Sequence, residues 1–397
     1  GGWLNWGKIR GSYGKSGQTF TSAYLAHGLM NIMDKSFFGK TGITTDKPVS
    51  PYLTWEKTRQ YDLGLDMDMF NYRLNVKLDY YYKYTSSLIY DIPIPGSLYA
   101  FGAQVENAME ISNEGLELEL QADILRESAV SWRMKFNMAR NWNRFEKSYS
   151  GKDVVDGDGT LLVVGRPLNG LYVWAHRGYY NSDAEVPRLY KIDGQEIYFN
   201  GVATNGISGA VGDYRLLDLD GDGNPDSYYA GSPLPLAHGG WVNELMWKNF
   251  DLNVLVNFTI GRKMINNRMG LGFSRQSEDG HLTKLFDYRK LRPWDGVNKK
   301  PNAPAWGNSL SMNTDSAIEK VHHLALKQIT LGYNLPDRIS KKAGLSGVRF
   351  FLTAENLFYL SNYSGGNPEV VNIYTGRDNG DTYPLPRKYT LGLTLNF

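Results

Sequence analysis

The sequence predicts an all-β fold whose antiparallel strands cross a lipid bilayer as a β-barrel. Apolar and polar side chains alternate with a period of two in segments of about ten residues, the length that a tilted membrane strand needs. Tight turns and very long loops alternate between these segments, as is typical of outer-membrane barrels. The chain is also rich in aromatic residues, with 27 tyrosines and 10 tryptophans at a mean hydropathy of -0.42.

The last eleven residues show the alternation most clearly. Odd positions from Tyr389 to Phe397 carry apolar or aromatic side chains, whereas the even positions carry Lys, Thr, Gly and Asn. An apolar strand at the end of a soluble protein would invite aggregation, but in a barrel this face meets lipid. From this segment alone, a terminal strand of a soluble sandwich stays open as the alternative.

The same alternation recurs along the chain. The predicted strands span residues 6–14, 61–69, 74–84, 116–124, 130–138, 241–247, 250–260, 324–335, 348–360 and 387–397. Tight turns are predicted at 70–72, 126–128 and 248–249, and long loops over 86–111, 146–238, 263–320 and 361–386. The polar stretch that follows the first predicted strand, up to about Thr54, shows no period. Acidic and basic side chains share the polar face, as expected of a water-filled lumen.

Composition excludes several classes of protein. A net charge of +2 without a basic stripe argues against a nucleic-acid surface. No run approaches the ~20 apolar residues of a spanning helix, so any crossing must use strands. Cysteine is absent, which leaves no disulfide or thiolate site. The start of the chain is no signal peptide, so we expect a lost leader or a longer parent chain.

Several short motifs stand in order over nearly all of the chain. They are Lys8–Gly14, Trp55–Asp66, Asn113–Glu117, Gly212–Asp226, Leu326–Pro336, Ala354–Phe358, Tyr363–Glu369, Tyr383-Pro384 and the terminal Phe397. In this order they resemble the C-terminal half of the SusC/RagA-type TonB-linked outer-membrane transporters of Bacteroidetes. One motif alone would be weak, but the ordered set is specific. Ala325–Lys327 departs from the arginine usual in that family.

The resemblance implies that residues 1–397 are the C-terminal part of a plugged barrel of about 22 strands in a bacterial outer membrane. Members work with a SusD-like surface lipoprotein that closes over the barrel mouth, and they import oligosaccharides or peptides energised through TonB. The family's plug, TonB box and first barrel strands have no match here. We therefore expect this chain to be a fragment that joins the remaining half of the same transporter.

An acidic segment is the best local motif for a metal. The candidate ligands are Asp218, Asp220, Asp222, Asn224 (through its backbone carbonyl) and Asp226. This spacing of oxygen ligands suits Ca²⁺. The position of the bidentate Glu of a calcium loop is occupied by Tyr229, so a metal-free acidic turn stays open. No cofactor is required by any other motif.

No catalytic residue is predicted. The six histidines form neither an H-x-x-x-H nor an H-E-x-x-H spacing, and no nucleophile or phosphate-binding motif stands in a suitable context. Glu117 and Glu119 could imitate a glycosidase pair, but a lumen-facing acidic row explains them equally well. We expect the protein not to be an enzyme.

Loop aromatics are the candidate substrate contacts, because rings stack on sugar faces and on peptide side chains. They are Tyr172, Trp174, Trp294 and Trp306. Packing within the loops, or a place in the aromatic girdle, is the alternative for each of them. Two other functions stay open: a siderophore or cobalamin receptor of the wider TonB-dependent class, and a soluble β-rich glycan-binding protein.

Overall fold

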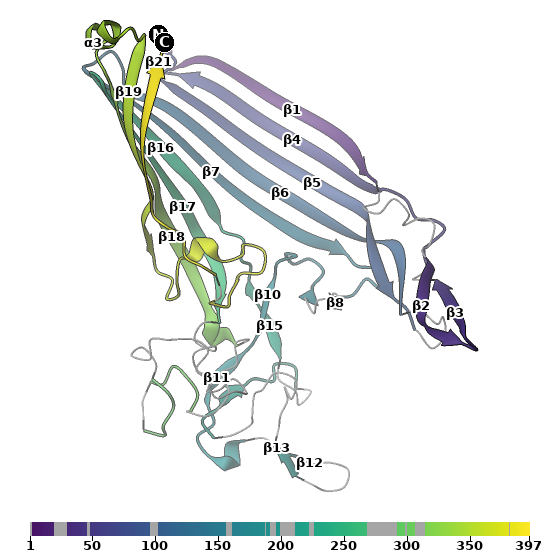
Figure 1. Ribbon diagram of the computed structural model, residues 1–397. Coiled ribbons are helices and arrows are strands. Elements are labelled where there is room, and N and C mark those ends of the chain that lie inside the picture. Colours follow the sequence, from purple (N-terminus) through teal and green to yellow (C-terminus); the bar gives the residue numbers. More distant parts are fainter. Residues whose placement is uncertain are drawn as a thin grey trace. The chain divides into compact units, whose positions relative to one another are not determined.

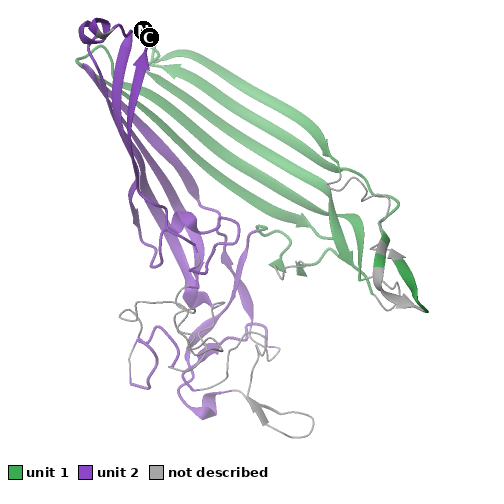
Figure 2. Cartoon of the chain, in the orientation of Figure 1, with its two compact units in different colours: residues 1–168 green, residues 169–397 purple. Residues whose placement is uncertain are grey.

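A computed structural model describes most of the chain. The described residues are 2–19, 30–45, 48–95, 102–155, 161–186, 188–190, 196–198, 211–221, 226–267, 292–297, 300–305, 314–380 and 382–397. The chain divides into two compact units, unit 1 with residues 1–168 and unit 2 with residues 169–397 (Figure 2).

Unit 1 is built from long strands that pair antiparallel in chain order (Figure 1). They are β1 (Leu4–Gln18), β4 (Glu56–Met69), β5 (Leu74–Pro93), β6 (Ala103–Leu125) and β7 (Val130–Lys147). Two small hairpins accompany them. These are β2 (Met30–Phe37) with β3 (Lys40–Thr45), and β8 (Val154–Val155) with β9 (Leu161–Leu162).

The turn from β4 to β5 is tight because three consecutive residues adopt left-handed backbone conformations. Phe70, Asn71 and Tyr72 have φ values of 52°, 57° and 60°. Positive φ values are uncommon outside glycine and asparagine. We infer that the pairing of β4 with β5, which continues up to Met69 and Leu74, holds the three residues in this conformation. Glu127, in the turn from β6 to β7, has φ 59°. The predicted turns at 70–72 and 126–128 are confirmed.

Unit 2 repeats this arrangement with a second set of long antiparallel strands. They are β16 (Ala237–Trp247), β17 (Phe250–Asn266), β18 (Ile318–Asn334), β19 (Gly347–Ser361) and β21 (Lys388–Asn396). The helix α3 (Asp337–Ser340) and the 3-10 turn η5 (Lys341–Ala343) connect β18 to β19. Among the described residues, no helix has the length and apolarity that crossing a membrane requires.

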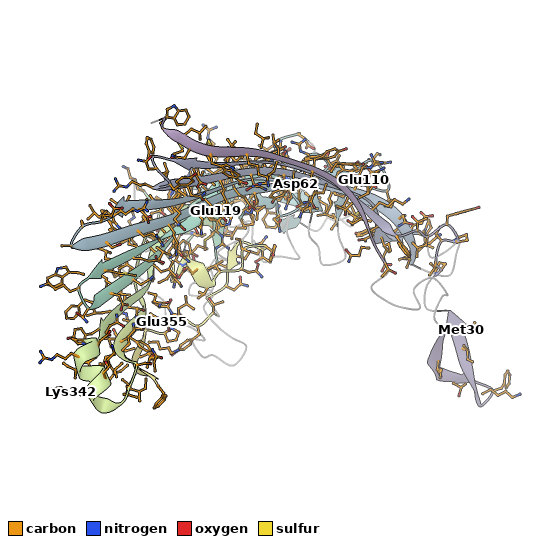
Figure 3. All side chains as sticks on the ribbon, turned by 90° about the horizontal axis from the view of Figure 1, so that it is seen from above. Met30, Asp62, Glu110, Glu119, Lys342 and Glu355 are labelled. Carbon is orange, nitrogen blue, oxygen red and sulfur yellow. The ribbon has the colours of Figure 1, made fainter. Side chains whose placement is uncertain are left out.

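The two faces of the strands differ in chemistry as predicted, and Figure 3 shows side chains projecting from both. On the apolar face of unit 1, Ile9 is 77% exposed and Leu63 is 58% exposed. On the polar face, the Arg10 guanidinium lies 2.8 Å from the Asp66 carboxylate and 2.7 Å from that of Asp79. An apolar surface of this extent suits lipid, so we call it the outward face and the polar one the inward face.

A β-bulge in β18 shifts the alternation by one residue. Val256 of β17 pairs with Leu326, but the preceding Leu255 pairs with Gln328, so Lys327 is an extra residue on β18. A period of two therefore predicts the wrong face for residues on one side of the bulge. The bulge keeps leucine and isoleucine outward along the whole strand.

Buried apolar side chains gather where loops pack on the ends of strands. In unit 1 they are Met109, Phe145 and Val154. In unit 2 they form two clusters, Leu171, Val173, Ala230 and Ile265, and Met264, Val321, Tyr363 and Val371. In these clusters, side chains at the ends of the long strands are buried under the loops.

Two predicted boundaries were wrong. The loop expected over 86–111 is mostly strand, because β5 continues to Pro93 and β6 begins at Ala103, with bulges between Thr85 and Ile89. The stretch before Thr54, which shows no sequence period, contains the β2–β3 hairpin. Both errors have the same origin: alternation breaks where a bulge or a solvated hairpin replaces a half-buried strand.

Candidate functional site

The long loop that precedes β16 folds into small sheets in unit 2. β10 (Leu171–Trp174) pairs with β15 (Ser227–Gly231), and β11 (His176–Tyr179) pairs with β14 (Tyr214–Leu216). Leu171 and Val173 point into an apolar cluster with Ala230 and Ile265, the latter near the end of β17. Burial of these side chains fixes the loop to the barrel strand.

The rings of His176, Tyr179 and Tyr214 contact one another on these sheets, and Tyr228 is connected to them through Asp315. These four residues are called the aromatic cluster below. The His176 ring meets the Tyr214 ring edge to face, with centroids 4.7 Å apart. The Tyr179 ring stacks on Tyr214 at 5.3 Å and an interplanar angle of 24°. Such geometries are the favourable ones for aromatic pairs.

The aromatic cluster is held by the residues that lead into β18. Asp315 hydrogen-bonds the Nδ1 atom of His176 and accepts a hydrogen bond from the Tyr228 hydroxyl at 3.3 Å. Ser316 donates from its hydroxyl to that of Tyr214 at 3.0 Å. The Tyr228 side chain is thus oriented by Asp315 while 38% of the residue stays exposed.

Burial makes the tyrosines of the aromatic cluster harder to deprotonate. Removal from water raises the pKa of Tyr179, Tyr214 and Tyr228 above the ordinary value, and the neighbouring Asp315 carboxylate raises that of Tyr228 further. At neutral pH these side chains offer uncharged ring faces and hydroxyl groups. Such groups can stack on a ligand and exchange hydrogen bonds with it, but they supply no charge.

A second loop, between β19 and β21, is tied to the barrel strands by a buried arginine. Arg262 of β17 is 6% exposed and donates to three backbone carbonyls, those of Pro368 at 3.1 Å, Val371 at 2.9 Å and Asn372 at 2.6 Å. The Asn169 side chain donates to the Tyr374 carbonyl at 3.1 Å. The two loops of unit 2 are therefore linked to each other as well as to the strands.

The acidic segment brings three of its predicted ligands together. Asp218, Asp220 and Asp226 each place a carboxylate oxygen within 4.8 Å of the others. The Asp226 carboxylate accepts the backbone N–H groups of Leu219 and Asp220, and Asp218 accepts that of Gly221 at 2.6 Å. Oxygen donors with this convergence fit Ca²⁺. Asp222 and Asn224 lie outside the described residues, and calcium binding stays a prediction.

With this geometry in place, comparison with known proteins identifies the family. The family described as TonB dependent receptor-like, beta-barrel matches residues 2–229. The chain belongs to this family. Its members are outer-membrane proteins, which confirms the predicted location and leaves the soluble glycan-binding alternative without support.

Relatives cover the whole chain but extend well beyond it. TonB-dependent receptor P26 of Formosa agariphila is 30% identical, over 98% of this chain and 40% of the relative. SusC of Bacteroides thetaiotaomicron is 26% identical, over 98% of this chain and 37% of its own length. The structure of the RagAB peptide transporter matches with a TM-score of 0.78 at 24% identity, covering 100% of this chain and 41% of that one. The chain spans about 40% of these relatives' length.

Within this receptor barrel, the predicted substrate residues lie in different surroundings. Tyr172 and Trp174 alternate with the buried Leu171 and Val173 on β10, so they point away from the apolar cluster. The Tyr172 ring lies 5.6 Å from that of Tyr229. Two further candidates remain. The indole N–H of Trp294 donates a hydrogen bond to the side-chain oxygen of Asn181 at 3.3 Å, and the Trp294 ring packs on Gly212. Trp306 lies outside the described residues.

The remaining polar residues of the receptor barrel fit a lumen wall. Glu119 lies 3.5 Å from Lys77, and Glu117 stands opposite Asp79 in the next strand. These carboxylates belong to an inward row of mixed charge. Sequence reasoning missed Tyr228, since nothing in its local sequence reveals the distant Asp315 that orients it.

Proposed function

We propose that residues 1–397 form the C-terminal part of the barrel of an importer that carries oligosaccharides or peptides across the outer membrane without covalent chemistry. The observation that carries this proposal is the aromatic cluster, fixed to the strand ends of a TonB-dependent receptor barrel. A neutral and rigid aromatic surface binds ligands at a low cost in side-chain entropy.

Three observations support a sugar or peptide cargo. Tyr228 presents an oriented, half-exposed ring. Tyr172 and Trp174 lie on the other side of β10 from the apolar cluster and are partly exposed there. Uncharged rings and hydroxyls complement sugar faces and peptide side chains better than they complement a charged chelate. A siderophore or cobalamin receptor remains the alternative within the same family.

The partners follow from the proposed import. A SusD-like surface lipoprotein would close over the loop-bearing end, and the TonB complex would supply energy through the part of the receptor that precedes this chain in its relatives. SusC of Bacteroides thetaiotaomicron, one of those relatives, supports the assignment to nutrient import. Co-purification of the tagged full-length receptor from membranes tests both partners: a lipoprotein present in equal amount is expected, and its absence would contradict the lid.

The cargo is tested by deleting the full-length gene and growing the strain on defined nutrients. Loss of growth on one oligosaccharide or peptide source is expected, with growth on iron chelates unchanged. Restoration by the intact gene is the control. A defect confined to iron chelate or cobalamin uptake would replace our proposal with the alternative receptor class. Collapse of the proton-motive force should stop uptake and leave surface binding intact.

The aromatic cluster is tested in the full-length receptor by replacing Tyr228 with alanine. The Tyr228→Ala change should weaken cargo binding about threefold to tenfold, because an aromatic contact contributes roughly 0.5–1.5 kcal/mol. Tyr52→Ala, at a tyrosine of unit 1 that is 85% exposed, is the matched control and should leave affinity unchanged. Alanine variants of Tyr172, Trp174, Trp294 and Trp306 then rank the predicted contacts. Equal affinity in all of them would exclude the site.

A further inference from the structure

The outward face of unit 1 changes character along its strands. Side chains that stand opposite one another in successive strands form rows across β1, β4, β5, β6 and β7. One row is Ile9, Leu65, Leu78, Leu118 and Met138, and it is wholly apolar. Its composition matches the hydrocarbon layer of a bilayer.

The next two rows toward the loops carry the aromatic belt. The first is Gly11, Leu63, Tyr80, Leu116 and Arg140, and the second is Tyr13, Tyr61, Tyr82, Glu114 and Trp142. The rings of Tyr13 and Tyr61 lie 4.8 Å apart, and Tyr80 of the row below donates to Glu114 at 3.0 Å. Tyrosine and tryptophan gather where lipid tails meet headgroups, so this belt marks the edge of the hydrocarbon. The tight turns lie on the periplasmic side, which makes this edge the outer one.

The next row lies at the level of the lipid headgroups and is rich in cations. It consists of Lys15, Arg59, Tyr84, Ser112 and Arg144, and we call it the cationic row. Lys15 stands directly opposite Arg59, and like charges in this position repel. Lys15, Arg59 and Arg144 are all exposed, and none of the three has an ion-pair partner within the described residues.

The acidic side chains near the cationic row are engaged elsewhere. Glu110 accepts from the Tyr84 hydroxyl and lies 3.8 Å from Lys147, and Glu146 accepts from Ser112 at 2.5 Å. The Glu114 carboxylate accepts hydrogen bonds from the Tyr80 hydroxyl and from the indole N–H of Trp142. These carboxylates hold the belt and the polar positions of β6 in place. Among the described residues, none of these carboxylates forms an ion pair with a cation of the row.

We propose that the cationic row binds the phosphate groups of lipids in the outer leaflet of the membrane. Guanidinium and ammonium groups in one line at headgroup depth complement phosphates, and an anion between Lys15 and Arg59 would relieve their repulsion. The row faces away from the lumen, so this lipid contact is independent of the imported cargo. It requires only that the barrel lies in the outer membrane.

The test uses the full-length receptor in detergent, titrated with phosphorylated lipid A and followed by native mass spectrometry. The variant carries Lys15→Gln, Arg59→Gln and Arg144→Gln, which keep side-chain length and polarity. We expect the affinity for lipid A to fall on the order of a hundredfold when three surface cations are lost. Wild-type binding should also weaken as salt is raised.

The matched control removes three exposed cations from the connection between β18 and β19. It carries Arg338→Gln, Lys341→Gln and Lys342→Gln, and it should bind lipid A like the wild type. Equal binding by both triple variants would overturn the proposal. So would equal wild-type affinity for dephosphorylated lipid A, or full competition by inorganic phosphate at the same concentration, which would indicate a free-anion site.

If the triple variant fails to fold, Arg59→Gln alone and the charge-preserving pair Arg59→Lys with Arg144→Lys decide the question. The single variant should lose about fivefold in affinity, and the charge-preserving pair should retain most of it. A phosphate site built from these cations would be contradicted if Arg59→Gln bound lipid A as tightly as the wild type. It would also be contradicted if the charge-preserving pair lost as much affinity as a variant that lacks the charges.

Discussion

Units 1 and 2 follow the same strand rule but differ at the ends of their strands that carry the long loops. In unit 2 the outward positions of β17 stay apolar from Phe250 to Ile260, and beyond them Arg262 is buried under a loop. In unit 1 the outward face passes from leucine through tyrosine to exposed cations. Alternating apolar and polar residues therefore form the wall of both units. The residues near the strand ends differ: in unit 2 they hold a loop, and in unit 1 they lie at the level of the lipid headgroups.

The largest expected effect comes from breaking the loop attachment of unit 2. Arg262→Ala removes the donors to three buried carbonyls, which should cost about 3–5 kcal/mol of local stability. Hydrogen exchange of residues 362–380 should rise by orders of magnitude while β4 and β5 stay protected. Arg338→Ala, at an exposed arginine, is the control. Unchanged exchange would mean that apolar packing alone holds the loop.

Raising the pH should loosen the aromatic cluster of unit 2. Burial raises the pKa of Tyr179 and Tyr214 in the folded loop. In the opened loop the same tyrosines lose their phenol protons at a lower pH, from about 10 upward, so a higher pH favours opening. Stability is flat below that pH and falls above it, by at most about 1.4 kcal/mol per ring at pH 11.

Tyrosinate absorbance combined with hydrogen exchange measures this loss. Tyr179→Phe should shift the onset of exchange and remove one late-titrating tyrosine, whereas Tyr52→Phe, at a tyrosine that is 85% exposed, should leave the onset of exchange unchanged. If Tyr179→Phe left both the late titration and the onset of exchange unchanged, the packing of the aromatic cluster would be refuted.

A glycine substitution tests whether the walls of the two units are packed alike. The Tyr81 ring covers Gly115 so closely that an added Cβ would lie 2.5 Å from its Cε1 atom, and in unit 2 Phe351 covers Gly392 in the same way. Alanine at either position should destabilise the barrel by about 1–2 kcal/mol. Gly14→Ala, where nothing lies within 4 Å, should have almost no effect. Urea unfolding in lipid vesicles compares them, and a cost at Gly14 as large as at Gly115 would contradict close packing.

The smallest effect concerns the acidic segment of unit 2. Ca²⁺ should slow exchange at residues 217–221 and release heat on binding, because three carboxylates already converge there. Asp220→Asn should abolish both responses, and Asp123→Asn in unit 1 should leave them intact. Absence of heat and of any thermal shift in the wild type would show that the segment is a metal-free turn.

Much of the barrel wall could be predicted from the sequence, for a local reason. Alternation needs only neighbouring residues, so the strands around Tyr61, Leu118 and Leu393 were found correctly. The turns at Phe70–Tyr72 and Lys248 were found because polar and bulky residues interrupt the alternation there. The bulge at Lys327 and the extension of β5 to Pro93 were not found, since a bulge depends on the partner strand.

The candidate site was only partly predictable. Composition selected Tyr172, Trp174 and Trp294 as loop aromatics, and the spacing of Asp218, Asp220 and Asp226 predicted that their carboxylates would converge. Tyr228 could not be selected, because its orientation comes from Asp315, 87 residues away. Whether any of these residues binds cargo or calcium stays a prediction.

The sequence by itself determined the fold class, the two faces of each strand and the ordered motifs of the receptor family, because each depends on residues close together in the chain. The tertiary structure decided which side chains share a row and which loops are fixed. Lys15 and Arg144 lie in one row only through the register of five strands. Arg262 reaches Val371 only because the loop folds back 109 residues later. Such pairings are set by the closure of long loops and by strand register, and no local pattern records them.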